Sequence, residues 1–391
     1  MNRFERHPRL TLFLIWLGLL AVIIGVVEWG LPLMQDRLNL TTKNDRGEAR
    51  VLNLREWPPG MVKVFAAPEN RANDPIGPVD HEYEFRIDHA GFIWPSLVHA
   101  KPDFEIVFLG GSTTECMYVR PATRFPHLVG RLLEDRSGLK INSINAGKSG
   151  NNTMHLVLNY LGKVAPRRPR FVVFMEAVND IGILTKENSY WNDDKDLFLV
   201  ERKWTLWDLT YREVRRGLST IEEGITSAFV TRSPTQAPTA KSPVADLDEA
   251  KVRRQEELLG ELLRNSFEPA LRSFVRLARA WGSEPILMTQ VYAGAGSDDG
   301  AASDFLSPEA LRQGNFDRAS FGSLHNYANA IVRHVAISED AVLIDLVGAR
   351  RWTREDLYDG LHFTETGSRH VAEIVARALT PLILQAGVAK Q

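Results

Sequence analysis

The sequence predicts an α/β fold in which a mostly parallel sheet is covered by helices on both faces. Short apolar runs that end in glycine or polar residues recur along the chain, and stretches with the apolar spacing of a helix lie between them. Clusters of polar residues follow several of the apolar runs. That placement is typical of a parallel sheet, because its functional groups gather at the carboxyl ends of the strands.

Five apolar runs are predicted to form the strands of this sheet. The first, FEIVFLGG, ends in two glycines, as expected of a buried parallel strand that enters a turn. An earlier segment at 82–88, EYEFRID, has the alternation of a further strand. The five sheet strands are expected at 104–111, 139–145, 170–180, 284–292 and 341–348.

Helices are predicted between and after these strands. One helical stretch runs through His155 and Leu161, and a longer helix near 248–281 has apolar residues at helical spacing. Pro269 is expected to kink or break the longer helix, because proline lacks the N–H that a helix interior needs. The last helix is expected from about residue 365.

Length and composition exclude several classes of protein. The 391 residues suffice for one large α/β domain with additions or for two small domains, and 44% apolar with 25% charged residues is ordinary for a globular protein. A formal net charge of −2 and the lack of a nucleic-acid motif predict no nucleic-acid partner. The single cysteine, Cys116, cannot form an intrachain disulfide, and we expect a buried thiol on the helix after the first strand.

An apolar segment near the N-terminus predicts a membrane anchor. Residues 10–27 carry no charge and are long enough to cross the hydrocarbon core of a bilayer as a helix. A cleaved signal peptide is the alternative, but the run is longer than a typical signal-peptide core and no small-x-small cleavage site follows it. We expect a short tail at 1–9, a transmembrane anchor at 10–33, a stalk and lead-in at 34–100 and a main domain at 101–391.

The charges around the anchor bear on its orientation. Arg3, Arg6 and Arg9 precede it, which favours a cytoplasmic N-terminus. Four basic residues beyond the span weaken this bias: Arg37, Lys43, Arg46 and Arg50. Because the tail is short, we expect the main domain outside the cytoplasm, in a periplasm or at the cell surface.

A segment at about 183–247 interrupts the alternation of strands and helices. Its first part holds Trp191, Trp204 and Trp207 among charged residues, and its last part, 231–246, is rich in Pro, Ser, Thr and Ala without periodicity. The last part is predicted to be a disordered loop. Three interpretations of the tryptophan-rich part stay open, namely a cover over the site, a contact with the membrane interface, and a small satellite core.

Ser112, in GGSTTE at 110–115, is the candidate nucleophile. It follows a strand and two glycines, which permit a sharp turn into a helix and expose the serine hydroxyl. Its own N–H would lie at a helix N-terminus, where it can stabilise an oxyanion. A serine that merely caps a helix is the alternative interpretation of this motif.

Three further motifs supply the other parts of a serine hydrolase site. Asp359 lies three residues before His362 in a loop, so its carboxylate can hold the imidazole in the tautomer that accepts the serine proton. Gly150, in NAGKSG after the second strand, and Asn179, in VND after the third, can donate hydrogen bonds to an oxyanion. A helix-entry glycine and a helix cap are the alternatives for these two residues.

Two better-known motifs are absent. A phosphate-binding loop that ends in AGKS would need a glycine at position 142, which is Asn142, so nucleotide binding is not expected. Neither Ser112 nor Ser149 lies in GxSxG, which argues against an ordinary α/β-hydrolase.

In these four motifs, taken in order, the sequence resembles the SGNH (GDSL) hydrolase family of serine esterases. RIDHAGF at 86–92 is also similar to segments that precede the nucleophile in membrane-associated bacterial members. The resemblance covers about residues 100–382, without the insert at 183–247. It implies a flavodoxin-like three-layer α/β/α sandwich with a five-stranded parallel sheet, in agreement with the five predicted strands.

The resemblance also implies a role for each motif residue. Ser112 would be the nucleophile and His362 the base, oriented by Asp359, while the Ser112 N–H, Gly150 and Asn179 would form the oxyanion hole. The chain departs from the family at two places, because the aspartate of GDS is Gly111 and the glycine two residues before the asparagine is Ala177. Neither change removes a catalytic group, and both can alter the shape of the pocket.

No metal or organic cofactor is expected. His81, His89 and His99 lack metal-binding spacing and are interpreted as loop or surface residues. The acidic segment 297–304 lacks the spacing of a calcium loop and is interpreted as a flexible rim. Glu115, close behind the nucleophile, is expected to be a solvated carboxylate in the first turn of a helix, and a place at the pocket entrance is the alternative.

Three hypotheses for the function follow. The first is hydrolysis of a carboxylic ester through an acyl-enzyme on Ser112, with acyl or acetyl groups on an envelope glycan or lipid as substrates. The second is an O-acyltransferase with the same residues, which the sequence does not distinguish because the difference is the exclusion of water. The third is a non-catalytic envelope scaffold, which the presence of all five site residues disfavours. The sequence does not indicate an oligomeric state.

Overall fold

A computed structural model describes most of the predicted main domain and parts of the segments before it. The described residues are 13, 15–25, 51–52, 54–67, 80–192, 197–201, 257–292 and 318–388. The chain divides into two compact units. The first is Met1–Leu52 with Val200–Val244, and the second is Asn53–Leu199 with Ala245–Gln391.

Little of the first unit is described. Residues 15–25 are helical, and strand β1 (Val51–Leu52) pairs antiparallel with β7 (Val200–Glu201). Among the residues described, no helix combines the length and the apolar character that a bilayer crossing requires. Much of the predicted anchor at 10–33 lies outside the described residues, so the anchor stays a prediction.

The second unit contains the predicted parallel sheet. Its strands are β4 (Phe104–Gly110), β5 (Ile141–Asn145), β6 (Phe171–Met175), β8 (Glu284–Met288) and β9 (Val342–Ile344), in the order β5-β4-β6-β8-β9. All four pairings are parallel, and Phe108 of β4 faces Asn145 on one side and Val173 on the other. This order is flavodoxin-like, with its topological switch beside β4. The five strands are confirmed, and each is shorter than predicted.

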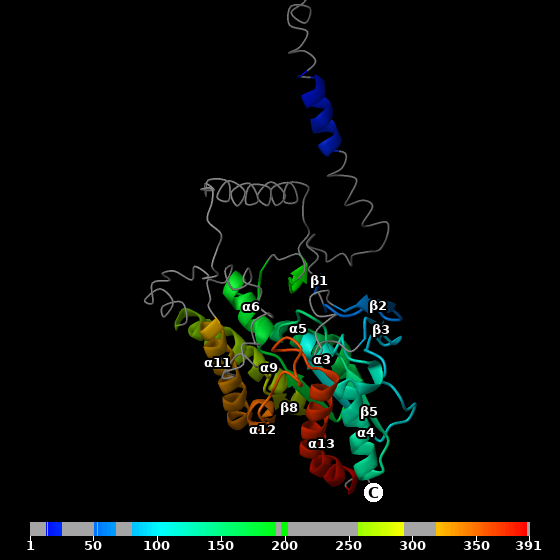
Figure 1. Ribbon diagram of the computed structural model, residues 1–391. Helices are drawn as coiled ribbons and strands as arrows, with labels where there is room; N and C mark the ends of the chain where they lie inside the picture. Colours follow the sequence, from blue (N-terminus) through cyan, green and yellow to red (C-terminus); the bar gives the residue numbers. More distant parts are fainter. Residues whose placement is uncertain are drawn as a thin grey trace, which may run out of the picture. The chain divides into compact units, whose positions relative to one another are not determined.

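Helices cover both faces of this sheet (Figure 1). On one face lie α4 (Phe125–Ser137) and α13 (Glu365–Val388), which pack together and are joined by an ion pair between Arg136 and Glu373. On the other face lie α5 (Thr153–Asn159), α9 (Glu268–Ala280) and α11 (Arg318–Ser338). The ring of Phe174 on β6 lies 4.9 Å from that of Phe274 on α9, centroid to centroid. The three-layer arrangement is therefore confirmed.

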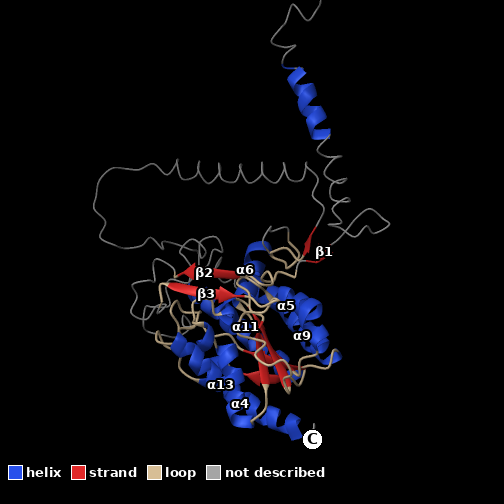
Figure 2. Cartoon of the chain, turned by 90° about the vertical axis from the view of Figure 1, so that its right-hand side faces the viewer, coloured by secondary structure: helices blue, strands red, loops and turns tan. Residues whose placement is uncertain are grey.

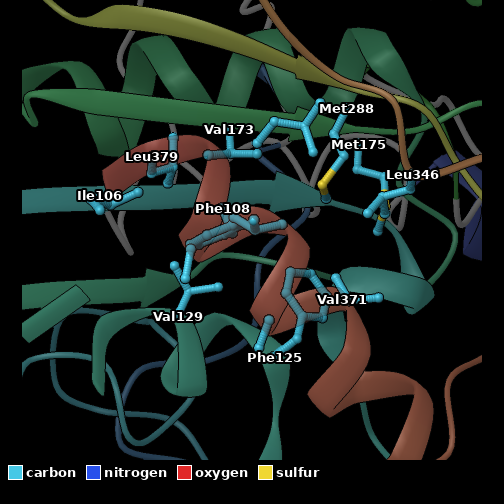
Figure 3. Close-up of a cluster of buried hydrophobic side chains, with 14 of the residues drawn as sticks. Ile106, Phe108, Phe125, Val129, Val173, Met175, Met288, Leu346, Val371 and Leu379 are labelled. Atoms are coloured by element: carbon cyan, nitrogen blue, oxygen red, sulfur yellow. The ribbon is translucent and has the colours of Figure 1, made fainter. Parts of the chain in front are cut away.

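The core under α4 and α13 explains why these runs form central strands. Alternate residues of the strands project into it, and the strands are buried on both faces, as near-continuous apolar runs require. Figure 3 shows Ile106 and Phe108 of β4 in one cluster with Val371 and Leu379 of α13.

Shorter elements connect these layers. Pro269, the predicted helix breaker, lies in the first turn of α9 directly after a π-helical turn, where its missing N–H is tolerated. Shorter helices and turns among the described residues include α3 (Ser112–Glu115), Pro121–Thr123, Tyr160–Val164, Ala165–Arg167, α6 (Val178–Glu187), Leu263–Phe267 and α12 (Leu346–Ala349).

Residues 54–67 and 80–100, assigned to a stalk and lead-in by sequence, pack into the second unit. Strands β2 (Val62–Ala66) and β3 (Glu82–Arg86) form an antiparallel hairpin (Figure 2). The alternation of β3 buries Tyr83 and Phe85, and Ile93 donates its N–H to the carbonyl of Asn145 on β5 at 3.0 Å. These contacts bring the lead-in to the carboxyl end of the sheet.

The insert predicted at 183–247 is described only in part. Helix α6 continues to Glu187, Tyr190 is buried and Trp191 is exposed. Trp204, Trp207 and the segment 231–246 lie outside the described residues.

Candidate active site

The predicted site residues come together at the carboxyl edge of the sheet. Ser112 opens α3 directly after β4, Gly150 lies in the loop after β5, and Asn179 lies in the first turn of α6 after β6. Asp359 and His362 lie in the loop that precedes α13. This edge, next to the switch between β4 and its two neighbours, is where ligands bind in open parallel sheets.

Ser112, His362 and Asp359 form a continuous chain of hydrogen bonds. The Ser112 Oγ lies 2.7 Å from the Nε2 of His362, and the Nδ1 of His362 lies 2.7 Å from the Oδ2 of Asp359. The other oxygen of Asp359 accepts the N–H groups of Leu361 at 3.1 Å and His362 at 2.8 Å. With Nδ1–H donating to the carboxylate, Nε2 is the acceptor for the serine hydroxyl.

Asp359 is held as a carboxylate in spite of its burial. Burial by itself would raise its pKa, but the charge of His362 and the hydrogen bonds from His362 and Leu361 outweigh it, so the pKa lies below the usual value. The ring of Tyr358 stacks on the imidazole of His362, with centroids 5.6 Å apart and planes 14° apart. Burial raises the pKa of Tyr358 well above its usual value, so the imidazole lies against a neutral phenol.

The backbone at Gly110 and Gly111, the two residues before Ser112, is packed so closely against neighbouring atoms that a side chain at either position would not fit. A Cβ at Gly110 would overlap the side chain of Thr114 and the carbonyl of Met175, and one at Gly111 would overlap the side chains of Glu176 and Asn179. The helix that Ser112 opens is a single turn, so the hydroxyl lies at the end of the strand without a long helix behind it.

Cys116 was expected on a helix, but it lies at the C-terminal end of this single turn. It adopts the left-handed conformation with φ of 54°, and its thiol donates to the carbonyl of Thr113 at 3.3 Å. The predicted burial is confirmed, and it raises the pKa of the thiol to about 12. A thiol that stays protonated is a weak nucleophile.

The loop after β5 brings Gly150 beside the end of β4. The N–H of Lys148 donates to the carbonyl of Gly110 at 3.1 Å, and Gly150 has φ of +75°, a conformation that favours glycine. The Nδ2 of Asn179 donates to the carbonyl of Asn151 at 3.0 Å, which links the first turn of α6 to the same loop. Gly150 and Asn179, the two candidate oxyanion donors besides the Ser112 N–H, therefore lie on two segments that meet next to Ser112.

Arg55, which the sequence analysis did not single out, braces this loop. One of its guanidinium nitrogens, Nη1, donates to the carbonyl of Ser149 at 2.9 Å and to Oδ1 of Asn151 at 2.7 Å. The side-chain amide of Asn151 donates back to the carbonyl of Arg55 at 3.2 Å. These three bonds fix the two residues that flank Gly150.

Glu115 corrects a prediction, because its carboxylate is fully buried and not solvated. It accepts the indole N–H of Trp57 at 2.7 Å, the N–H of Ser149 at 3.1 Å and the Ser149 hydroxyl. Burial raises its pKa, and these hydrogen bonds act in the opposite direction. Lys148 places its ammonium 3.5 Å from the centre of the Trp57 ring. Glu115 thus links the turn that begins at Ser112 to the loop that carries Gly150 and to the lead-in residue Trp57.

Two buried carboxyl groups lie behind Asn179. Glu176 follows β6 and Asp180 follows Asn179, and neither side chain reaches solvent. Asp180 accepts from the N–H and the hydroxyl of Thr153, both at 2.9 Å, and from the hydroxyl of Tyr190. Burial raises the pKa of Glu176 to about 8, with the charge of Asp180 as the next cause, and burial raises that of Asp180 to about 6.

A cavity of about 320 Å³ opens beside the Ser112 hydroxyl. More of the lining of this cavity is apolar than polar, although Thr113, Glu115 and Ser149 also contribute to it. Its lining includes Met117, Tyr118, Val119, Tyr358 and Phe363. The cavity can therefore receive an apolar group attached to a carbonyl that Ser112 attacks.

The remaining polar candidates do not gather around a metal. Within the described ranges, no group of three or more His, Cys, Asp or Glu side chains is arranged to hold one. His99 pairs with Glu134 at 2.5 Å, and the segment 297–304 lies outside the described residues.

A parallel flavodoxin-like sheet with a serine, a histidine and an aspartate hydrogen-bonded at its carboxyl edge defines the class of serine hydrolases. Within that class, the model of the GDSL-like lipase/acylhydrolase family matches residues 108–370. The chain belongs to this family, and it is an enzyme that acts on ester bonds. The match includes all five predicted site residues.

Two acetylxylan esterases are among the solved structures to which the chain is similar. Axe2 from Geobacillus stearothermophilus is 17% identical, with a TM-score of 0.40 over 71% of this chain and 94% of that one. The acetyl xylan esterase AlAXEase is 16% identical, with a TM-score of 0.39 over 70% of this chain and 99% of that one. No curated protein matches the sequence.

Proposed function

We propose that this enzyme hydrolyses a carboxylic ester through an acyl-enzyme formed on Ser112. The observation that carries the proposal is the unbroken chain from the serine hydroxyl to the His362 imidazole and the Asp359 carboxylate, with both links at 2.7 Å. This arrangement activates a hydroxyl that is otherwise a weak nucleophile.

The first half of the reaction forms the acyl-enzyme. The Oγ of Ser112 bonds to the carbonyl carbon of the ester while the Nε2 of His362 takes the hydroxyl proton, and the carbonyl oxygen becomes an oxyanion. His362 then gives this proton to the departing alkoxide, and the bond between carbon and the alcohol oxygen breaks. Asp359 stabilises the imidazolium throughout, in keeping with its lowered pKa.

The second half returns the enzyme to its starting state. Water attacks the acyl-serine carbonyl, His362 takes a proton from it, and the same proton is given to the Oγ of Ser112 as the acid leaves. The oxyanion forms twice, and three donors are proposed to hold it, namely the N–H groups of Ser112 and Gly150 and the amide of Asn179. Each such donor is worth about 3 kcal/mol in the transition state.

The cavity beside Ser112 supports a short acyl group. A volume of about 320 Å³ lies at the lower end of the range for small-molecule pockets, about 300–1,000 Å³. We propose acetyl or other short acyl esters on an envelope glycan or lipid. The apolar segment 10–27, as an anchor with the domain outside the cytoplasm, would bring the enzyme to such substrates.

The test is the hydrolysis of p-nitrophenyl acetate by the purified full chain and by two serine variants. Ser112→Ala should abolish hydrolysis, and Ser273→Ala, at an exposed serine on α9, should leave it unchanged. A series of p-nitrophenyl esters from acetate to decanoate should show the highest kcat/KM among the shortest esters. Equal hydrolysis by the wild type and Ser112→Ala would rule out the proposed role of Ser112.

A further inference from the structure

Gly111 leaves a space beside the nucleophile that another side chain fills. The family motif GDS has an aspartate at this position, and this chain has none. A Cβ at Gly111 would overlap one carboxyl oxygen of Glu176 and the amide nitrogen of Asn179. Gly111 has φ of −85°, outside the left-handed region, so it is the side-chain volume and not the backbone that excludes other residues.

Glu176 reaches this space from the end of the neighbouring strand. Its side chain is fully buried, and its Oε1 accepts the N–H groups of Ala177 at 3.0 Å and Asn179 at 2.9 Å. Those N–H groups lie at the start of α6, where backbone donors have no partner within the helix. The carboxyl group of Glu176 therefore fixes the first turn of the helix that carries Asn179.

The second oxygen of Glu176 faces Gly111 and Asn179. This Oε2 is buried and makes no hydrogen bond of good geometry in the described part of the chain, but the Asn179 side chain lies close enough to it to act on the pKa of Glu176 in the lowering direction. The volume that this oxygen occupies limits the positions open to the Asn179 amide, whose Nδ2 also donates to the carbonyl of Asn151.

We propose that Glu176 is a positioning residue of the oxyanion hole, whose carboxyl group takes the place of the aspartate missing at Gly111 and holds Asn179 in register with Ser112. The inference rests on the proposed function, because Asn179 is taken as an oxyanion donor. It assigns no proton transfer to Glu176. Gly111 and Glu176 then form a complementary pair, in which a small residue on one strand end makes room for a long one on the next.

Four variants of the full chain test this pairing by their kcat and KM for p-nitrophenyl acetate. Glu176→Ala should lower kcat by about ten- to a hundredfold with KM changed less than about twofold. Removal of a whole oxyanion donor costs about 10²–10³ in kcat, and this variant displaces Asn179 without removing it, so the expected loss is smaller. Glu176→Gln keeps the shape and the acceptor, so it should retain kcat within about threefold. Gly111→Asp should lose more than about a hundredfold, because its side chain overlaps Glu176 and Asn179.

The double variant Gly111→Asp/Glu176→Ala separates positioning from packing. It restores the motif aspartate and removes the overlap, so it should recover kcat to within about tenfold of the wild type and exceed Gly111→Asp alone. Thermal unfolding and circular dichroism of each variant identify any that fail to fold. If Glu176→Ala does not fold, the double variant and Glu176→Gln still decide the question.

The result that would overturn the inference is a folded double variant with no more activity than Gly111→Asp, or a folded Glu176→Ala with the kcat of the wild type. Wild type without Ser112-dependent hydrolysis would instead refute the proposed function. The two failures are therefore distinguishable in one set of measurements.

Discussion

The Oγ of Ser112 and the Nε2 of His362 lie 2.7 Å apart although 250 residues separate them in the chain. Ser112 is placed by β4 and His362 by the loop before α13, which packs on α4 over the core beneath the sheet. The distance between the Ser112 hydroxyl and the His362 imidazole therefore depends on how α13 packs against α4 and the sheet.

Asp359→Asn should lower kcat by about 10³–10⁴ with little change in KM. An amide can donate to Nδ1 and so hold the imidazole in the wrong tautomer, as the corresponding change does in serine proteases. The measurement is steady-state hydrolysis of p-nitrophenyl acetate, with Asp103→Asn at an exposed carboxylate as the control. An Asp359→Asn enzyme within tenfold of the wild type would show that the carboxylate is dispensable.

Arg55→Ala should lower kcat by about ten- to a hundredfold. It removes the donors to the Ser149 carbonyl and to Asn151, and misplacing a catalytic donor by about 1 Å can cost about a hundredfold. Arg131→Ala, at an exposed arginine on α4, serves as the control. Unchanged kinetics of Arg55→Ala would mean that the loop holds its shape without the lead-in.

Gly110→Ala and Gly182→Ala should shift stability in opposite directions. The first places a methyl group against the Met175 carbonyl and Thr114, which should cost at least about 1–3 kcal/mol. The second lies in α6 with open space around it, where alanine should add about 0.5–1 kcal/mol. Denaturant unfolding measures both, and the same sign for the two changes would be inconsistent with the packing at β4.

The stability gained by Glu176→Gln relative to the wild type should grow as pH rises from about 4.5 to about 8. Burial, followed by the charge of Asp180, raises the pKa of the Glu176 carboxyl to about 8, whereas an unfolded glutamate titrates near 4.3. In this window the native state binds more protons than the unfolded state, so wild-type stability falls as pH rises. Glutamine does not titrate and lacks this loss.

Denaturant unfolding at pH 5, 6, 7 and 8 measures this difference in the free energy of unfolding. Glu373→Gln, at an exposed glutamate on α13, is the matched control and should show no such growth. A difference between Glu176→Gln and wild type that stays constant over the four pH values would show that Glu176 is ionised in the native protein throughout.

Local sequence signals sufficed to predict the sheet and to select the motif residues that the structure brings together at its edge. Apolar runs such as Phe104–Gly110 are unambiguous because a strand buried on both faces is apolar along its length. Ser112 was recognisable because its glycines precede it directly in the chain, and Asp359 and His362 because both lie in one short loop.

The bracing of the site was not predictable, because it depends on contacts between residues far apart in the chain. Arg55 meets Asn151 across 96 positions, and Trp57 meets Glu115 across 58. No spacing rule links such residues. The position of Glu115 in the sequence is typical of a solvated first-turn carboxylate, and only its contacts with Trp57 and Ser149 in the folded protein bury it. The contact between Glu176 and the space at Gly111 likewise joins residues 65 positions apart, on the ends of two neighbouring strands.

The most direct test of Ser112 as the nucleophile is the site of covalent labelling by a fluorophosphonate, located by mass spectrometry of peptides from the folded full chain. We expect one adduct, on Ser112, formed at a rate that falls at least about a hundredfold in His362→Ala, because the imidazole activates the hydroxyl. An adduct on another serine, or labelling of Ser112 at the same rate without His362, would contradict this expectation.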